Sequence, residues 1–233
     1  HIVSSFDRDL EAIQALIMKM GGLVEESILN ASIALEKRDE KLAKSVRDGD
    51  KLIDKLEEQV NEEAARILAL RAPTAGDLRT VLSVFRVSAN LERIGDYSKN
   101  IAKRSSVVIQ MQPIVGTASS LRRMAKTVDL MLKDVLDAYI QRDVDLAADV
   151  RERDAEVDQM YSALFREYLT FMMEDPRNIT ACMHLHFMAK NIERMGDHVT
   201  SIAEQVIYLV TGELPDDDRP KQDRTPYEQG QET

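Results

Sequence analysis

The chain of 233 residues is acidic, with 41 Asp and Glu against 31 Lys and Arg and a formal net charge of -10. This charge argues against nucleic acid as a partner, because nucleic-acid binding requires a basic surface, and it favours cations or basic protein surfaces instead. The sequence contains only 9 Gly, 6 Pro and no Trp, a composition that favours helices over sheets.

The cysteine content indicates the cellular setting. Cys182 is the single cysteine, so the chain has neither an intramolecular disulfide nor a Cys-rich metal motif, and a reducing, cytoplasmic setting fits best. Cys182 lies within an apolar pattern and is predicted to be a buried, inert thiol. No apolar run is long enough to span a bilayer and no signal-peptide pattern opens the chain, so we expect no direct membrane insertion.

Three helices are predicted in the first half of the chain. Apolar residues spaced three and four apart indicate an amphipathic helix over residues 6–35 and a second over about residues 40–70. Pro73 and Gly76 then break the pattern, and a third helix follows to about Val108.

The same order returns after a break at residues 112–117. Helices are predicted over residues 121–140, from about residue 146 to the break at Pro176, and over residues 185–209. Arg142-Asp143 matches Arg38-Asp39, and the apolar positions of the second helix repeat at a constant offset of 104 residues. The predicted fold class is therefore all-α, a tandem duplication of an antiparallel three-helix bundle with six helices. The predicted domains are a first bundle (1–110), a second bundle (117–212) and a polar C-terminal tail (213–233) without a core of its own.

A short sequence occurs twice and carries two acidic residues each time. Residues 90–96 read Asn-Leu-Glu-Arg-Ile-Gly-Asp and residues 191–197 read Asn-Ile-Glu-Arg-Met-Gly-Asp. Residues four apart share a helix face, so Glu92 and Asp96 lie together beside the apolar seam, and the small Gly95 permits close approach. The preceding helix of each unit carries a similar pair. The predicted sites are therefore Asp50, Asp54, Glu92 and Asp96 in the first unit and Asp154, Asp158, Glu193 and Asp197 in the second.

Four neighbouring carboxylates require positive charge, because like charges at this spacing each destabilise a helix by about 0.2–0.5 kcal/mol. Arginines are one source, since Arg93 and Arg194 lie inside the repeated sequence. A hard cation is another, because carboxylates are preferred ligands of Mg, Ca and Mn and common ligands of iron. With arginine partners the carboxylates would form only a solvated helix edge, and the pattern alone leaves this interpretation and a bound cation open.

Catalysis has no support in the sequence. His184 and His186 are two apart and diverge on a helix, and the counterpart of His198 in the first unit is Tyr97, which favours a local role. No set of nucleophile and base, no phosphate-binding glycine loop and no Glu-x-x-His pair of a di-iron bundle is found. We expect that the protein is not an enzyme.

The motifs together resemble a known family. The opening Phe6-Asp7-Arg8-Asp9-Leu10, the loop Arg71-Ala72-Pro73 leading to Asp77-Leu78-Arg79, and both copies of Glu-Arg-(Ile/Met)-Gly-Asp lie in the duplicated frame. With these motifs the chain resembles, from about residue 6 to residue 213, the PhoU family of bacterial phosphate-transport accessory and regulatory proteins.

The resemblance implies a negative regulator of phosphate uptake and of the phosphate-starvation (Pho) response. It implies an adaptor between the ATPase subunit of the phosphate ABC transporter (PstB) and the sensor histidine kinase (PhoR). It also implies a homodimer in the cytoplasm that partners recruit to the inner face of the membrane.

The resemblance further implies metal clusters of Fe, Zn, Mn or Mg, ligated by Glu/Asp-x-x-x-Asp pairs at the eight acidic positions named above. One departure concerns the helix after the motif, where the family has Asn in both copies. The first copy has Asn100 but the second has Ser201, which predicts a weaker or empty second site.

The function expected from the sequence is a cytoplasmic, non-catalytic inhibitor of phosphate signalling, acting through acidic surfaces that meet basic partners or hold bridging cations. Two alternatives belong to other classes. One is a metal-storage or redox protein built on a helical bundle, and the other is a purely structural helical scaffold.

Overall fold

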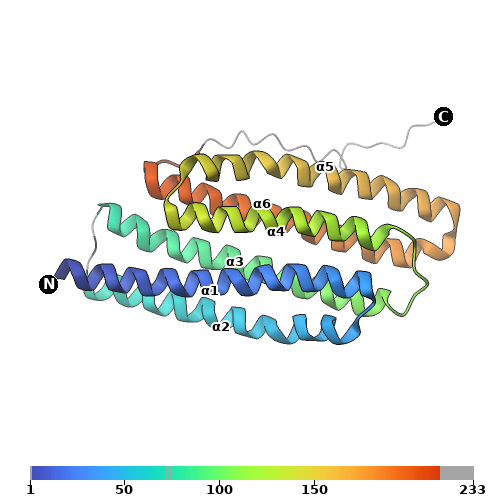
Figure 1. Ribbon diagram of the computed structural model, residues 1–233, viewed down its shortest axis with the longest axis horizontal. Helices are drawn as coiled ribbons and strands as arrows, with labels where there is room; N and C mark the ends of the chain where they lie inside the picture. The colour runs from blue at the N-terminus through green and yellow to red at the C-terminus, as the bar shows by residue number, and fades with distance from the viewer. Residues whose placement is uncertain (1, 72, 74, 216–233) are drawn as a thin grey trace.

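The computed structural model describes residues 2–71, 73 and 75–215, and long helices account for nearly all of these residues (Figure 1). Within these residues there are six α-helices, one short 3-10 helix and no strand. The elements in chain order are α1 (Ile2–Lys37), α2 (Glu40–Arg71), α3 (Ala75–Val108), α4 (Thr117–Gln141), α5 (Val144–Glu174), η1 (Pro176–Asn178) and α6 (Ile179–Thr211).

Equivalent turns connect the first two helices of each unit. Arg38 and Arg142 both adopt the left-handed conformation, each with φ of 54°. Asp39 and Asp143 follow them and cap the next helix, each accepting a hydrogen bond at 3.0 Å, from the backbone N–H of Leu42 and of Leu146 respectively. These side chains satisfy donors that a helix N-terminus otherwise leaves free. The duplication seen in the sequence is therefore repeated in backbone detail.

Two antiparallel three-helix bundles pack side by side. Helix α3 packs on α1 and α2 in the first bundle, and α6 packs on α4 and α5 in the second. The bundles meet through α1 against α4 and α3 against α6, so that α2 and α5 flank the four inner helices on opposite sides (Figure 1). The starts of α3 and α6 lie at opposite ends of the long axis (Figure 1). The predicted fold class is confirmed.

One apolar core runs through both bundles. Buried Leu, Ile, Val, Met and Ala side chains from all six helices belong to the same cluster. Cys182 is fully buried in it, as predicted, and burial raises the pKa of its thiol. None of the helices in the described part of the chain is long and apolar enough to cross a membrane. The predicted tail (213–233) lies outside the described residues from residue 216 onward.

The connection between the bundles is held in place by the first turn of the fold. The guanidinium of Arg38 donates hydrogen bonds to the backbone oxygens of Ile109 and Met111, the latter at 2.7 Å. Residues 109–116 are thereby fixed against the α1–α2 turn, and α4 starts beside α1.

Candidate functional sites: two acidic clusters between paired helices

The first acidic cluster, Asp50, Asp54, Glu92 and Asp96, lies where α2 packs on α3. Asp50 is buried, with 4% of its surface exposed, while the other three are half-buried. Gly95 permits this close packing, because a Cβ at that position would lie 3.0 Å from Ile53 Cδ1 and 3.7 Å from Asp50 Oδ1. The glycine of the repeated sequence thus brings the two acidic pairs together.

Electrostatics within the first cluster reflect this proximity. Burial, together with the charges of Asp50 and Asp96, raises the pKa of Asp54. Burial, together with the charges of Asp96, Glu57 and Asp54, raises the pKa of Glu92. The four carboxylates of the cluster therefore influence one another across the two helices.

Lys99 supplies positive charge to this cluster, a role that the sequence pattern did not predict. Its Nζ lies 2.5 Å from Asp50 Oδ2 and 2.6 Å from Asp96 Oδ1, so it bridges α2 and α3. A signal was present, because Lys99 follows Asp96 by three residues and such pairs share a helix face. Nothing in that spacing, however, indicates that the lysine also reaches Asp50 on another helix.

Arg93, one of the two arginines considered above, has a smaller role in the first cluster. It pairs with Asp96 at 3.1 Å from an exposed position and lies over the ring of Tyr97 at 5.3 Å. Exposed pairs of this kind contribute about 0–1 kcal/mol. The buried carboxylate of Asp50 is therefore balanced by Lys99 and not by the arginine of the motif.

The second acidic cluster, Asp154, Asp158, Glu193 and Asp197, lies where α5 packs on α6. Three of its members are buried, with 6%, 5% and 7% exposure for Asp154, Asp158 and Glu193. A Cβ on Gly196 would lie 2.8 Å from Asp154 Oδ1, so the close approach at Gly95 recurs here. This cluster is more deeply buried than the first.

Charges and contacts at Glu193 connect the second cluster. Burial raises the pKa of Glu193, the charges of Asp197 and Asp158 raise it further, and Lys190 opposes the change from 2.9 Å away. Because α2 and α5 lie on opposite flanks, the two clusters are on opposite sides of the molecule (Figure 1).

His184, His186 and His198 make contacts between helices and belong to neither cluster. His198 Nδ1 is 2.7 Å from Asn90 Oδ1, and its ring centroid is 5.7 Å from that of Tyr97 across the α3–α6 contact. His184 contacts Arg104, whereas His186 contacts the rings of aromatic neighbours on α5 and α6. These positions agree with a local role for His198 and with diverging His184 and His186.

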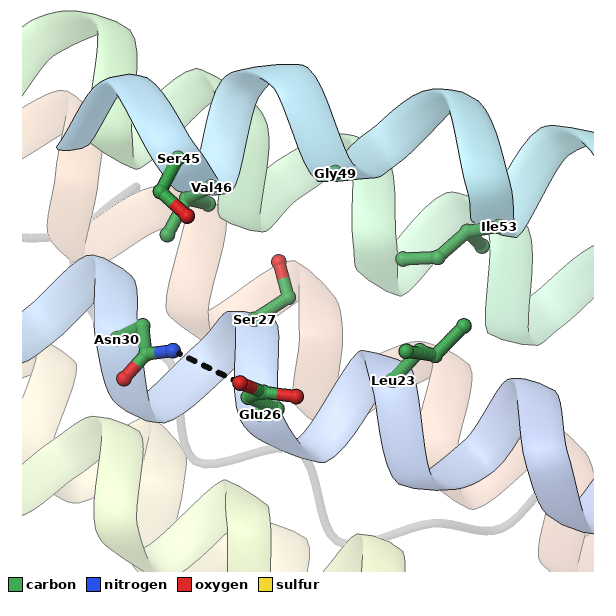
Figure 2. A pocket seen from close by; sticks show the side chains of 8 residues that line it. All are labelled: Leu23, Glu26, Ser27, Asn30, Ser45, Val46, Gly49 and Ile53. Atoms are coloured by element: carbon green, nitrogen blue, oxygen red, sulfur yellow. Dashed lines mark hydrogen bonds between the residues drawn. The ribbon is translucent and has the colours of Figure 1, made fainter. Parts of the chain in front are cut away.

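A small hollow between α1 and α2 was not predicted (Figure 2). Its volume is about 120 Å³, and Glu26 on its wall accepts a hydrogen bond from Asn30 at 3.5 Å. Gly49 leaves one side open, since nothing lies within 4 Å of a Cβ there. The space is too small for a ligand of ordinary size. The lining residues are Leu23, Glu26, Ser27, Asn30, Ser45, Val46, Gly49 and Ile53.

The acidic clusters have the residue types but not the arrangement of a metal centre. Among the described residues, no three His, Cys, Asp or Glu side chains are positioned to hold one metal ion. The donor chemistry fits a hard cation, because every predicted ligand is a carboxylate. In the first cluster the ammonium of Lys99 lies between Asp50 and Asp96. Metal ligation by the eight residues stays a prediction.

Comparison with known proteins identifies the family. The model of the PhoU domain matches residues 17–105 and residues 121–206, one match in each bundle. The chain belongs to the PhoU family. The family predicted from the repeated sequence is therefore correct.

Individual PhoU proteins are similar over nearly their whole length. A relative from Rhizobium meliloti (strain 1021), named phosphate-specific transport system accessory protein PhoU homolog, is 46% identical over 97% of this chain and 95% of its own. The crystal structure of PhoU from Pseudomonas aeruginosa has a TM-score of 0.86 at 38% identity, covering 89% of this chain and 100% of that one. The phosphate transport system regulatory protein PhoU from Streptococcus pneumoniae has a TM-score of 0.83 at 30% identity, covering 91% and 99%. These names describe accessory and regulatory proteins, in agreement with the prediction that the protein is not an enzyme.

Proposed function

We propose that this protein is an accessory regulator of phosphate transport that represses the phosphate-starvation response while phosphate is plentiful. The observation that carries the proposal is the similarity to the Rhizobium meliloti accessory protein across nearly the whole of both chains. Two PhoU crystal structures with the same duplicated bundle support it. Regulation by binding also agrees with the acidic composition of the chain.

The regulator acts as an adaptor between the ATPase subunit of the phosphate transporter (PstB) and the sensor histidine kinase (PhoR), and it works as a homodimer. The support for this mode of action is the acidic surface at the first cluster, where half-buried Asp54, Glu92 and Asp96 present carboxylates on one flank. Basic groups of a partner are attracted to such a surface, and long-range attraction speeds their association.

Cations provide a second use for the same carboxylates. Fe, Zn, Mn or Mg would be held by the four carboxylates of each cluster. These are Asp50, Asp54, Glu92 and Asp96 in the first bundle and Asp154, Asp158, Glu193 and Asp197 in the second. A bound cation supplies positive charge through which an acidic cluster can join to anionic groups. The side chains of this chain provide oxygen ligands and, by burial, limit the access of water.

The test of regulation is a phosphate-starvation reporter in cells that lack the natural protein. Glu92→Gln with Asp96→Asn removes two charges of the first cluster while keeping side-chain volume, and is expected to derepress the reporter several-fold in high phosphate. Asp48→Asn with Glu62→Gln removes the same charge from exposed positions on α2 and is expected to repress normally. Circular dichroism checks that both proteins are folded. Normal repression by the cluster variant would contradict the proposed role of this surface.

The alternative functions give different results in a second measurement. Elemental analysis of protein purified without chelator, combined with an oxidase assay, identifies a stoichiometric redox-active iron centre if the protein stores or oxidises metal. Affinity purification that recovers neither the transporter ATPase nor the sensor kinase would favour the purely structural scaffold.

A further inference from the structure

Lys99 joins the two helices of the first acidic cluster. Its ammonium contacts Asp50 on α2 and Asp96 on α3 at hydrogen-bonding distance. The side chain of Asp50 is 5% exposed, and a charge buried to this extent requires an opposite charge nearby. Lys99 therefore offsets the cost of burying Asp50, and its Nζ is the positive group that contacts both helices of the cluster.

One carboxylate oxygen of this site is still available to bind a cation. Asp50 Oδ1 is buried and accepts no hydrogen bond from the described residues. Burial disfavours the ammonium, but hydrogen bonds to Asp50 and Asp96 outweigh it and raise the pKa of Lys99, so the side chain stays charged at neutral pH. An ammonium is a compact point charge with three donors, so it occupies the kind of position that a small metal ion takes among carboxylates.

The second bundle differs at the matching position. Thr200, at the offset of 101 residues that relates the two motifs, is fully buried and donates from Oγ1 to the backbone oxygen of Asp197 at 2.8 Å. Lys190 contributes positive charge to this cluster, but it reaches Glu193 from the preceding helical turn. The two clusters thus have the same acidic residue at each of four matching positions, but the first has Lys99 where the second has Thr200.

We propose that Lys99 is a tethered cation that competes with divalent metal ions for the first acidic cluster, so that this cluster binds such ions more weakly than the second. This inference rests on the proposed function, which assigns cation binding to both clusters. A divalent ion entering the first cluster has to displace an ammonium from Asp50 and Asp96. At the second cluster, Thr200 occupies the position equivalent to Lys99, so no ammonium has to be displaced from that position. We therefore expect the second cluster to bind divalent ions more tightly than the first, which is opposite to the order expected from Ser201.

The test is titration of the full chain with Mn²⁺ by isothermal calorimetry. Lys99→Met removes the ammonium and leaves an unbranched apolar side chain in its place. Lys103→Met is the matched control, because Lys103 is exposed and lies one turn further along α3. Lys99→Met is expected to gain a Mn²⁺ binding event at least tenfold tighter than wild type at this cluster, and Lys103→Met is expected to gain none. Adding Asp96→Asn to Lys99→Met is expected to remove the new event, which assigns it to the first cluster.

Two results would overturn the inference. One is that the wild-type protein already binds Mn²⁺ as tightly as the Lys99→Met variant does, at a site that Asp96→Asn removes. The other is Lys99→Met protein that gains no binding. If Lys99→Met is unstable because Asp50 has lost its partner, thermal unfolding with and without Mn²⁺ decides the same question. A larger rise in Tm for the variant than for wild type supports competition by Lys99, and equal rises refute it. The reporter assay tests the regulatory role independently, since it does not measure Mn²⁺ binding.

Discussion

Replacing Gly21 by alanine is predicted to destabilise the contact between the two bundles. Gly21 is buried on α1, and an added Cβ would lie 2.5 Å from Leu136 Cδ1 on α4. Leu136 is 1% exposed, so close packing leaves it little space into which to move. Gly22 is the matched control, because it is exposed and no atom lies within 4 Å of its added Cβ.

The magnitude follows from two opposing effects. Alanine is more favourable than glycine inside a helix by about 0.8–1.0 kcal/mol, and both variants gain this amount. Gly22→Ala should therefore raise the free energy of unfolding by about 0.8–1.0 kcal/mol. Gly21→Ala also overfills the core, which costs about 1–3 kcal/mol. The helix contribution cancels between the two variants, so Gly21→Ala should be less stable than Gly22→Ala by about 2 kcal/mol.

Urea denaturation followed by far-UV circular dichroism measures this difference. In thermal unfolding, a difference of about 2 kcal/mol corresponds to about 4–8 °C in Tm for a chain of this size. Equal stabilisation by the two alanines would refute the reasoning, because it would mean that α1 and α4 are not in close contact at Gly21.

Three further predictions concern single side chains. Asp143→Ala removes the acceptor for the backbone N–H of Leu146 and should lower the free energy of unfolding in urea by about 1 kcal/mol; an unchanged value would contradict the cap. Since the fold raises the pKa of Glu193, the ionised group destabilises the native state at neutral pH, and this penalty fades as the pH falls through the raised pKa and is absent below the ordinary value of 4.5. Glu193→Gln should therefore be more stable than wild type at pH 7 and lose this advantage in acid, whereas a pH-independent difference in urea midpoints would argue against it. The thiol of Cys182 should react with a thiol reagent in urea and not in native buffer, and rapid native reaction would be inconsistent with its burial.

The limits of helix prediction appear at helix starts. The sequence places the last helix from residue 185, but α6 begins at Ile179. The first turn of α6 combines the exposed Ile179 with the buried but small Ala181 and Cys182, so it adds only a weak apolar signal to the pattern. Similarly, α4 begins at Thr117 and not at Leu121. Periodicity detects repeated large apolar side chains, and a single turn at a helix end is too short to show the repeat.

The sequence by itself determined the six helices, the duplication and the pairing of acidic residues on shared helix faces. These properties depend on spacing within one helix, and Glu92 and Asp96 share a face whatever packs beside them. The tertiary structure decided what lies among the carboxylates. Close packing at Gly95 brings Asp50 within reach of Lys99, and deeper packing of α5 on α6 buries most of the second cluster. Such contacts depend on the distance between helices, which is set by side chains far apart in the sequence.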